Sequence, residues 1–436
     1  MGRGKLPRSV DVQVDALGLD GLGHARHLTR ELRVKNGLPG EQVSARAGRR
    51  RRGIWYVEAE RIEDPAAMRV APACGEFPRC GGCVMQHLDY AEQVRLKESQ
   101  LLDALAQSGI EPEQRLPAAT GPRFHYRSKA RLGVRVVGTD VLVGFRESFS
   151  NRVMRMDACP ALVPSLSSLI GPLRDLIAGL SQPDRVPQVE VAAGDGATAL
   201  VLRHLTALTP EDRIRIESFG ARHRVRCYTQ SGGYDTVTPA SRQAQQPYLS
   251  YGNPDFGLQF HFSVTDFTQV NLAMNRQLVR SAVDALRAPR GSAVLDLFCG
   301  IGNFSLPLAS RGLRVKGLES SAEAIDRARL NAARNGLGGW CEFAVQDLYD
   351  ADCPDPGGAE FVVLDPPRSG AGPNLAAWLA SGDVRRIVYV SCSPASFAAD
   401  AARLGECGYA LEQVRIFDMF PHTAHVETLG VFQKRW

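Results

Sequence analysis

The residue best suited to chemistry is Cys392, which follows the β-branched and aromatic run 388–391 and precedes Ser393 and Pro394. Such a run is typical of a buried strand, and the Ser-Pro pair ends it. The thiol is therefore expected at the carboxyl end of a strand, where open α/β sheets place their ligands. Taken alone, a cysteine there would be interpreted as an inert core residue. As a thiolate it would be a nucleophile.

Acidic and glycine-rich segments favour the reactive interpretation. Residues 294–304 predict a strand, the turn Cys-Gly-Ile-Gly and the start of a helix. Ser305 replaces the third glycine of the dinucleotide-binding fingerprint, which disfavours a pyrophosphate site. Glu319 ends a second predicted strand, where a carboxylate can accept hydrogen bonds from ribose hydroxyls. Asp347 ends a third predicted strand and is expected near the adenine of a bound cofactor, with Gln346 as the alternative. These strand ends resemble those of class I S-adenosylmethionine-dependent methyltransferases.

Two further strand ends complete the candidate site. Residues 361–364 are followed by Asp365, two prolines and Arg368, and the prolines fix the backbone at the mouth of the site. Similar motifs occur in amino-group methyltransferases, which need no cysteine, so Cys392 distinguishes the chemistry. A methyl transfer that does need a cysteine is the one to carbon 5 of uracil. This carbon can attack a sulfonium methyl group only after a thiolate has added to carbon 6. A base must later remove the carbon-5 proton. Glu427 is the candidate base. A surface acid is the alternative interpretation.

The elements that position these residues follow from the sequence pattern. From about residue 263 onward, strands, glycine-rich turns and helices alternate, which predicts a doubly wound, mostly parallel sheet. Residues 64–262 are expected to form a β-rich central domain with a helix over about 90–109. A hairpin is expected around residues 138–140. Three domains are therefore predicted, with boundaries at 1–63, 64–262 and 263–436.

The first 63 residues predict a small β-barrel with a basic surface. Val10, Val12 and Val14 alternate with polar residues, and glycine-rich breaks separate short strands. The segment holds 13 Lys and Arg against 8 Asp and Glu, so it carries the whole net charge of +5. The run Arg49–Arg52 is expected at a hairpin tip, where it would suit phosphates. The segment resembles the TRAM domain, an OB-like RNA-binding barrel.

Four cysteines form a further constellation. Cys74, Cys80 and Cys83 lie within ten residues, and Cys159-Pro160 follows far along the chain. Four thiolates suit either a structural zinc ion or a 4Fe–4S cluster, and the three-plus-one arrangement favours the cluster. Unrelated reduced thiols are the alternative, and disulfides are not expected in a cytoplasmic protein.

Together these motifs resemble the RNA uracil-5-methyltransferase family over nearly the whole chain. The resemblance implies that Cys392 is the nucleophile and Glu427 the general base, with His422 and His425 as weaker candidates for the base. It implies a 4Fe–4S cluster on Cys74, Cys80, Cys83 and Cys159. It also implies cofactor contacts by Gln269, Phe298, Asn303, Glu319, Asp347 and Asp365.

The presence of both the barrel and the cluster cysteines favours the branch of the family that acts on 23S rRNA. The expected function is therefore 5-methyluridine formation in 23S rRNA with S-adenosylmethionine as cofactor. The alternatives are a uridine elsewhere in rRNA or in tRNA, 5-methylcytosine formation, or a non-catalytic RNA-binding factor of ribosome assembly. A cytoplasmic monomer is expected, without a membrane partner, because no apolar run approaches the roughly 20 residues of a membrane helix.

Overall fold

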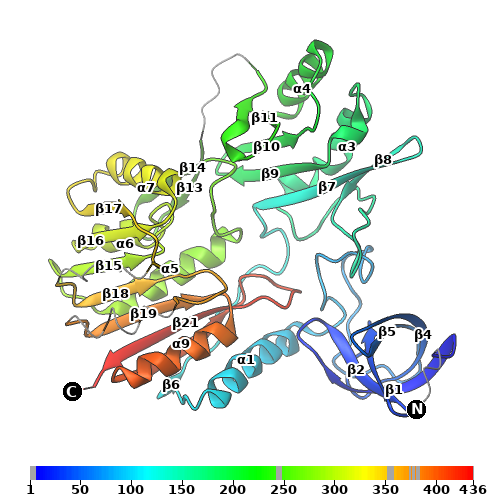
Figure 1. Ribbon diagram of the computed structural model, residues 1–436, viewed down its shortest axis with the longest axis horizontal. Helices are drawn as coiled ribbons and strands as arrows, with labels where there is room; N and C mark the ends of the chain where they lie inside the picture. Colours follow the sequence, from blue (N-terminus) through cyan, green and yellow to red (C-terminus); the bar gives the residue numbers. More distant parts are fainter. Residues whose placement is uncertain are drawn as a thin grey trace. The chain divides into compact units, whose positions relative to one another are not determined.

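The computed structural model describes residues 6–241, 248–350, 358–372, 375, 379 and 383–435. Contacts divide the chain into two compact units (Figure 1). The first consists of Met1–Ser99, Phe145–Met154 and Phe420–Ala424, and the second of Gln100–Gly144, Arg155–Met419 and His425–Trp436. No helix in the described ranges is long and apolar enough to cross a membrane.

The first unit contains the predicted closed barrel. Its strands are β1 (Ser9–Leu17), β2 (Leu22–His27), β3 (Arg30–Lys35), β4 (Gln42–Arg51) and β5 (Ile54–Ile62), in the order β1-β2-β3-β5-β4. Antiparallel pairing of β1 with β4 closes the barrel. Val10, Val12 and Val14 are each no more than 4% exposed and form part of its core, as their alternation predicted.

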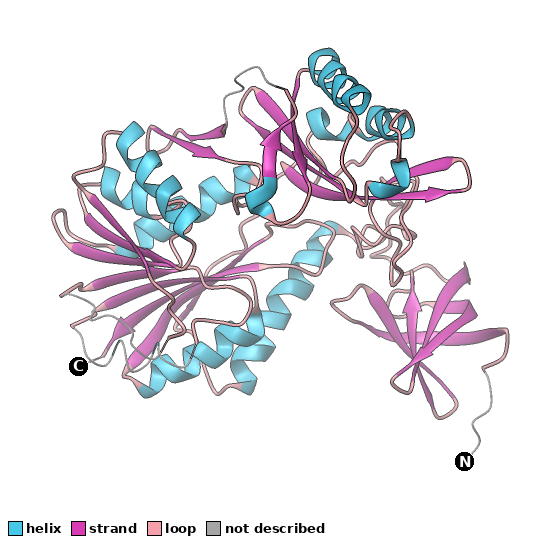
Figure 2. Ribbon diagram, turned by 45° about the horizontal axis from the view of Figure 1, so that its top comes forward, coloured by secondary structure: helices cyan, strands magenta, loops and turns pink. Residues whose placement is uncertain are grey.

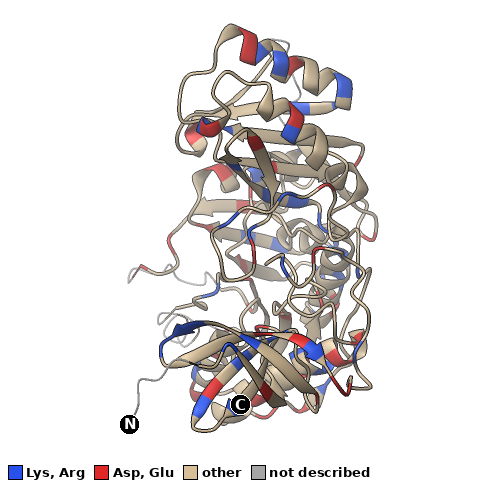
Figure 3. Ribbon diagram, turned by 90° about the vertical axis from the view of Figure 1, so that its right-hand side faces the viewer, with Lys and Arg blue, Asp and Glu red and all other residues tan. Residues whose placement is uncertain are grey.

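The hairpin between β4 and β5 presents the basic run at its tip. Arg51 pairs with Ile54, so Arg52 and Gly53 form a two-residue turn. Both have positive φ angles, 49° and 89°, as a type I′ hairpin turn requires. A left-handed conformation is unfavourable for arginine. The turn nevertheless keeps an arginine, which extends the run Arg49–Arg51 at the end of β4 (Lys and Arg are blue in Figure 3).

The cysteine segment follows the barrel and has little regular structure. Between β5 and helix α1 (Tyr90–Gln107) there are only isolated bridges, Arg69 with Leu88 and Cys80 with Glu147. The second of these joins the segment to residues Phe145–Met154 of the same unit. Helix α1 matches the predicted helix and is followed by Gly109 with a φ of 70°.

The second unit begins with a six-stranded sheet of order β12-β11-β10-β9-β7-β8. Its strands are β7 (Lys129–Val137), β8 (Asp140–Gly144), β9 (Gln188–Gly194), β10 (Ala197–Arg203), β11 (Val225–Gln230) and β12 (Val237–Pro239). The predicted hairpin around residues 138–140 is confirmed by the pairing of β7 with β8. Helix α3 (Ile170–Ala178) packs on β8, and α4 (Pro210–His223) packs on β11. The short helix α2 (Pro164–Ser167) and two 3₁₀ turns, Pro183–Arg185 and Tyr234–Thr236, complete this part.

An eight-stranded sheet of order β17-β16-β15-β18-β19-β21-β20-β6 forms the rest of the second unit. Strands β15 (Ala293–Leu297), β16 (Arg314–Glu319), β17 (Cys341–Val345), β18 (Phe361–Leu364) and β19 (Arg386–Ser391) are parallel. Strand β21 (Glu427–Lys434) runs antiparallel to both β19 and β20 (Tyr409–Phe417), and β6 (Gln114–Arg115) lies at the edge.

Helices cover this sheet on both faces (Figure 2). Helix α5 (Leu272–Leu286) packs on β18, β19 and β21, and α9 (Pro394–Glu406) on β19 and β20. Helices α6 (Ser305–Ser310) and α7 (Ala322–Arg334) pack on β16 and β17. The hairpin of β13 (Leu249–Asn253) and β14 (Leu258–Phe262) contacts α7. The predicted doubly wound, mostly parallel sheet is therefore present.

The order of the strands in the sheet reverses between β15 and β18. From β15 the sheet continues on one side through β16 to β17, whereas β18 lies on the other side of β15 and is followed by β19. Ligands of open α/β sheets bind outside the carboxyl ends of the strands at such a point. The predicted boundaries at residues 63 and 262 fall directly after β5 and β14. The three-domain division and the central iron–sulfur domain stay predictions.

Candidate active site

The carboxyl ends of the parallel strands bring the predicted residues to one edge of the sheet. Phe298 directly follows β15, Glu319 is the last residue of β16, and Asp365 directly follows β18. Cys392 follows β19. Because β21 is antiparallel to β19 with Ser391 opposite Thr428, its first residue, Glu427, reaches the same edge. The register thus explains how Cys392 and Glu427, which are 35 positions apart in the chain, reach the same edge of the sheet.

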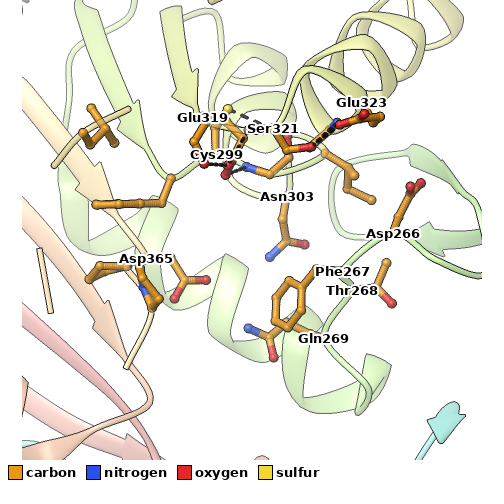
Figure 4. A pocket seen from close by; sticks show the side chains of 18 of the residues that line it. Asp266, Phe267, Thr268, Gln269, Cys299, Asn303, Glu319, Ser321, Glu323 and Asp365 are labelled. Carbon is orange, nitrogen blue, oxygen red and sulfur yellow. Dashed lines mark hydrogen bonds between the residues drawn. The ribbon is translucent and has the colours of Figure 1, made fainter. Parts of the chain in front are cut away.

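These residues line one pocket of about 870 Å³. All the residues predicted for catalysis and cofactor binding belong to its wall, namely Gln269, Phe298, Asn303, Glu319, Asp347, Asp365, Cys392 and Glu427. In Figure 4, Glu319 lies at one end of the pocket and Gln269 at the other, with Asn303 and Asp365 between them. Neither His422 nor His425 is among the described residues of this wall, which disfavours them as bases.

The end of the pocket near β16 is organised around Glu319. Its Oε2 accepts a hydrogen bond from the Gly300 backbone N–H at 3.3 Å, and its Oε1 accepts hydrogen bonds from Ser320 and Ser321. The turn that brings Gly300 there includes Phe298 with a φ of 61°, a conformation that is unfavourable for a phenylalanine. These donors fix the Glu319 carboxylate at the rim, where it can accept bonds from vicinal hydroxyls.

The predicted contact Asn303 is held by two residues that the sequence interpretation missed. Asn275 of α5 exchanges two amide hydrogen bonds with Asn303, at 2.8 and 3.0 Å, and Tyr251 of β13 donates to the Asn303 Oδ1 at 3.4 Å. Asn275 is 2% exposed. A buried polar residue on the apolar face of a predicted helix is the signal that could have found it.

Asp347 and its alternative, Gln346, both line the pocket. The Asp347 Oδ1 accepts the Tyr349 N–H at 2.9 Å, which fixes a turn after β17. The Tyr349 ring lies 5.9 Å from the Phe298 ring, centroid to centroid, and also lines the pocket. Together they form an aromatic wall that suits a flat heterocycle, and the choice between Asp347 and Gln346 stays a prediction.

Three buried carboxyl groups influence one another in and beside the pocket, and two of them, Asp365 and Glu427, line its wall. Burial raises the pKa of Asp296 to about 7, although its Oδ2 accepts a short hydrogen bond from Ser305. Burial and the charge of Asp296 raise the pKa of Asp365, while a hydrogen bond from Gln269 opposes the rise. Burial and the charge of Asp365 raise the pKa of Glu427 well above its ordinary value, while Arg368 opposes the rise. The surroundings of Glu427 therefore favour its protonated form.

Two of these carboxyl groups have oxygens without partners. The Asp296 Oδ1 and the Glu427 Oε2 are buried and have no hydrogen-bond partner among the described residues. Burying such atoms without a partner is costly. Glu427 belongs to the pocket wall, where a bound cation such as the sulfonium of S-adenosylmethionine would favour its ionised form.

The thiol of Cys392 is half-buried and is not activated in the free protein. Burial raises its pKa, and the charges of Glu427 and Asp365 raise it further, while Arg368 lowers it. The sequence interpretation expected a nearby cation such as Arg368 or a sulfonium to favour the thiolate. Arg368 acts in that direction but does not outweigh the other effects. Cys392 also precedes Ser393, the N-cap of α9, and helix N-termini favour thiolates.

The cysteine segment of the first unit has the donors that a metal centre needs. Cys80 is 8% exposed, and the Gly82 backbone N–H lies 3.4 Å from its Sγ. Cys74 is held by a hydrogen bond from its N–H to the Gln86 Oε1. In the second unit, Cys159 is 7% exposed and its N–H donates to Ser167. No group of three or more metal-ligating side chains is assembled among the described residues.

Comparison with known proteins gives the family of the chain. The family described as tRNA (Uracil-5-)-methyltransferase matches residues 254–340 and 357–436. The 23S rRNA (uracil(1939)-C(5))-methyltransferase RlmD of Bordetella parapertussis is 45% identical over 97% of this chain and 93% of its own length. The chain belongs to the RNA uracil-5-methyltransferase family. The protein of the same name from Alkalilimnicola ehrlichii is 44% identical and covers 99% of this chain and 98% of its own.

A solved member of the family shares the fold. The Pyrococcus abyssi tRNA (uracil-54, C5)-methyltransferase, in complex with S-adenosyl-L-homocysteine, matches with a TM-score of 0.75. It is 24% identical and covers 97% of this chain and 100% of that one. The predicted family, the class I methyltransferase fold and an S-adenosylmethionine-dependent methyltransferase are therefore confirmed.

Proposed function

We propose that the protein methylates carbon 5 of a uridine in 23S rRNA, with S-adenosylmethionine as methyl donor. The observation that carries this proposal is the meeting of Cys392 and Glu427 in the pocket that also holds Glu319 and Asn303. Relatives that are 41–45% identical over nearly the full length and named for uracil 1939 of 23S rRNA support the substrate.

The chemistry assigns one step to each reactive side chain. The Cys392 thiolate adds to carbon 6 of the uracil ring, and the ring becomes an enolate that is nucleophilic at carbon 5. When bound, S-adenosylmethionine supplies an electrophilic methyl group. Glu427 then removes the proton from carbon 5, the double bond between carbons 5 and 6 forms again, and the bond to the Cys392 sulfur breaks. One carbon-bound hydrogen is thus exchanged for one methyl group.

The electrostatics of the pocket link this chemistry to the positively charged cofactor. The surroundings of Cys392 and Glu427 raise the pKa of both groups and so favour their protonated forms. A positive charge in the same pocket favours both ionised forms. The nucleophile and the base therefore become active together, when the methyl donor is present.

The decisive experiment uses 23S rRNA labelled with tritium at carbon 5 of uracil. We expect the protein to release tritium to water in the presence of S-adenosylmethionine and Cys392→Ala to release none. Release unaffected by that substitution would overturn the mechanism. Parallel reactions with tRNA, and with RNA that carries tritium at carbon 5 of cytosine, separate the alternative substrates. A protein that binds RNA but releases no tritium would be a non-catalytic factor.

We further propose that Cys74, Cys80, Cys83 and Cys159 hold a 4Fe–4S cluster, with zinc as the alternative. The support is the donor set itself, four thiols with a backbone N–H directed at one of the sulfurs. Iron, sulfide and zinc analysis of purified protein tests the proposal. A brown protein with stoichiometric iron and sulfide is expected, and zinc without iron would contradict it.

We also propose that the barrel is a TRAM-like domain that binds RNA near the target. The Arg49 guanidinium lies 5.8 Å from the centroid of the Tyr56 ring and 5.7 Å from that of Phe149. Phe149 is 41% exposed, and Arg50 and Arg51 are exposed beside it. Arginines suit phosphates and exposed rings suit unstacked bases, so this surface fits single-stranded RNA.

A further inference from the structure

The segment Phe420–Ala424 belongs to the first unit, although it directly precedes the start of β21. Only His425 and Val426 separate it from Glu427 in the chain. Whatever fixes this segment therefore also limits where β21 can begin. The inference below rests on the proposed role of Glu427 as the base.

Gln93 of helix α1 binds this segment with its whole amide group. It is 1% exposed, and its Oε1 accepts the His422 backbone N–H at 3.1 Å. Its Nε2 donates to the carbonyls of Met85 and Leu88, at 2.9 and 2.8 Å, and lies 3.2 Å from the His422 Nδ1. The buried side chain of Gln93 thus connects Phe420–Ala424 with Met85 and Leu88, which follow Cys83 in the chain.

Lys97, one helical turn further along α1, binds the start of the segment. Its side chain is fully buried, and its Nζ donates to the Phe420 carbonyl at 3.0 Å. Burial of an ammonium group is costly, and an aliphatic side chain of similar size would avoid that cost. The hydrogen bond to Phe420 gives the lysine a reason to be there.

The backbone after Cys83 binds the middle of the segment. The N–H groups of Val84 and Met85 both donate to the His422 carbonyl, at 2.8 and 3.1 Å. His422 has a φ of 65°, a left-handed conformation that costs roughly 1–2 kcal/mol for a residue with a side chain. The hydrogen bonds from three sides hold it in that conformation.

We propose that Gln93 and Lys97 are positioning residues for the general base Glu427. They hold Phe420–Ala424 in a single conformation and thereby fix the start of β21. The step that needs Glu427 is removal of the carbon-5 proton, which comes after methyl transfer. Loosening the segment therefore slows release of the product from Cys392 more than it slows formation of the covalent adduct.

The test measures the covalent intermediate. Lys97→Met and Gln93→Glu would be mixed with 23S rRNA and S-adenosylmethionine carrying a labelled methyl group. The measured quantity is the share of label in a protein–RNA adduct that resists denaturing detergent. We expect this share to rise about tenfold over that of the unaltered protein. Glu427→Gln, which lacks the proposed base, should raise the share in the same way. Lys97→Arg, which keeps a donor, should restore low adduct levels.

Arg95→Met is the matched control on the same helix, because the Arg95 side chain is 67% exposed. It should behave as the unaltered protein. Gln93→Glu keeps the size of the side chain and the acceptor for His422, so the proposal can be tested even if Lys97→Met does not fold. Folded variants with unchanged adduct levels, or with adduct and product falling in parallel, would overturn the inference. If the unaltered protein forms neither adduct nor product, the proposed function itself fails.

Discussion

Two buried glutamates, one in each unit, differ in what surrounds them. Glu41 of the first unit is fully buried, and its carboxylate accepts the N–H groups of Leu38 and Ala66 and two bonds from Arg69, at 2.6–3.1 Å. Glu427 of the second unit is 3% exposed, and its Oε2 has no partner among the described residues.

The pKa values of the two groups move in opposite directions. Burial acts to raise the pKa of Glu41, but the bonds from Arg69 and the two backbone N–H groups outweigh it and lower the pKa. The pKa of Glu427 is raised well above its ordinary value. Hydrogen-bond donors around a buried carboxylate favour its ionised form, whereas burial without such donors favours the protonated form. The comparison predicts that substitutions of the two residues have different consequences.

The largest effect is expected for Glu427, the proposed base. Glu427→Gln should lower steady-state methylation of 23S rRNA by roughly 10²- to 10⁴-fold, because a general base is lost. The adduct with Cys392 should accumulate. The melting temperature should stay the same or rise, because an amide of the same size replaces a buried group that can ionise. Methylation within tenfold of the unaltered rate would show that another group is the base.

Substitution of Glu41, in contrast, should lower the stability of the fold. Glu41→Ala leaves the Arg69 guanidinium without its partner and should lower the free energy of unfolding of the first unit by roughly 3–5 kcal/mol. Chemical denaturation measures this loss. The control is Glu60→Ala, since Glu60 pairs with Arg46 at the surface and both side chains are more than half exposed. That substitution should cost less than about 1 kcal/mol. Equal losses for the two variants would contradict the comparison.

The dependence of stability on pH should separate the two regions. A lowered pKa means that the contribution of Glu41 is present above its ordinary pKa and is lost as pH falls through the lowered value. A raised pKa means that the contributions of Glu427 and Asp296 are present below their ordinary values. These are lost as pH rises, for Asp296 between 3.8 and about 7. The free energy of unfolding, measured by denaturation between about pH 4 and pH 8, should decline as pH rises, and Asp296→Asn should reduce that decline. A decline that Asp296→Asn leaves unchanged would contradict this assignment.

The smallest effect is expected at the exposed arginines of the hairpin between β4 and β5. Arg51→Ala should reduce the dependence of RNA affinity on salt, as the slope of log Kd against log salt, by about 1. Binding measured at several salt concentrations gives that slope. Arg222→Ala, the same charge change in the last turn of α4, is the control. Equal slopes in the Arg51 variant and the unaltered protein would mean that this hairpin does not contact phosphates.

The sequence was sufficient to find the parts of the site that depend on strand ends. Glu319, Asp365 and Cys392 each follow a run of buried β-type residues, and the geometry of parallel strands brings such ends together. Glu427 was found because the chemistry requires a base. The alternation of Val10, Val12 and Val14 with polar residues was likewise sufficient to predict a strand of the barrel.

Other features depend on contacts that no local pattern records. Asn275 lies in an ordinary amphipathic helix, and its pairing with Asn303 is visible only once α5 is packed. The direction in which the pKa of Cys392 shifts depends on the balance of burial, two carboxylates and one arginine. The grouping of Phe145–Met154 and Phe420–Ala424 with the barrel unit joins segments that are far apart in the sequence.

The link between α1 and the Phe420 segment also has a consequence for how the chain is made. Gln93 and His422 are 329 residues apart. At about 5–20 residues per second, the ribosome adds the second partner many seconds after the first. Through that interval the amino-terminal unit lacks the hydrogen bonds of Gln93 and Lys97 to the segment. A product truncated before residue 420 never gains them. The first unit of such a product is therefore expected to be less stable than that of the full chain.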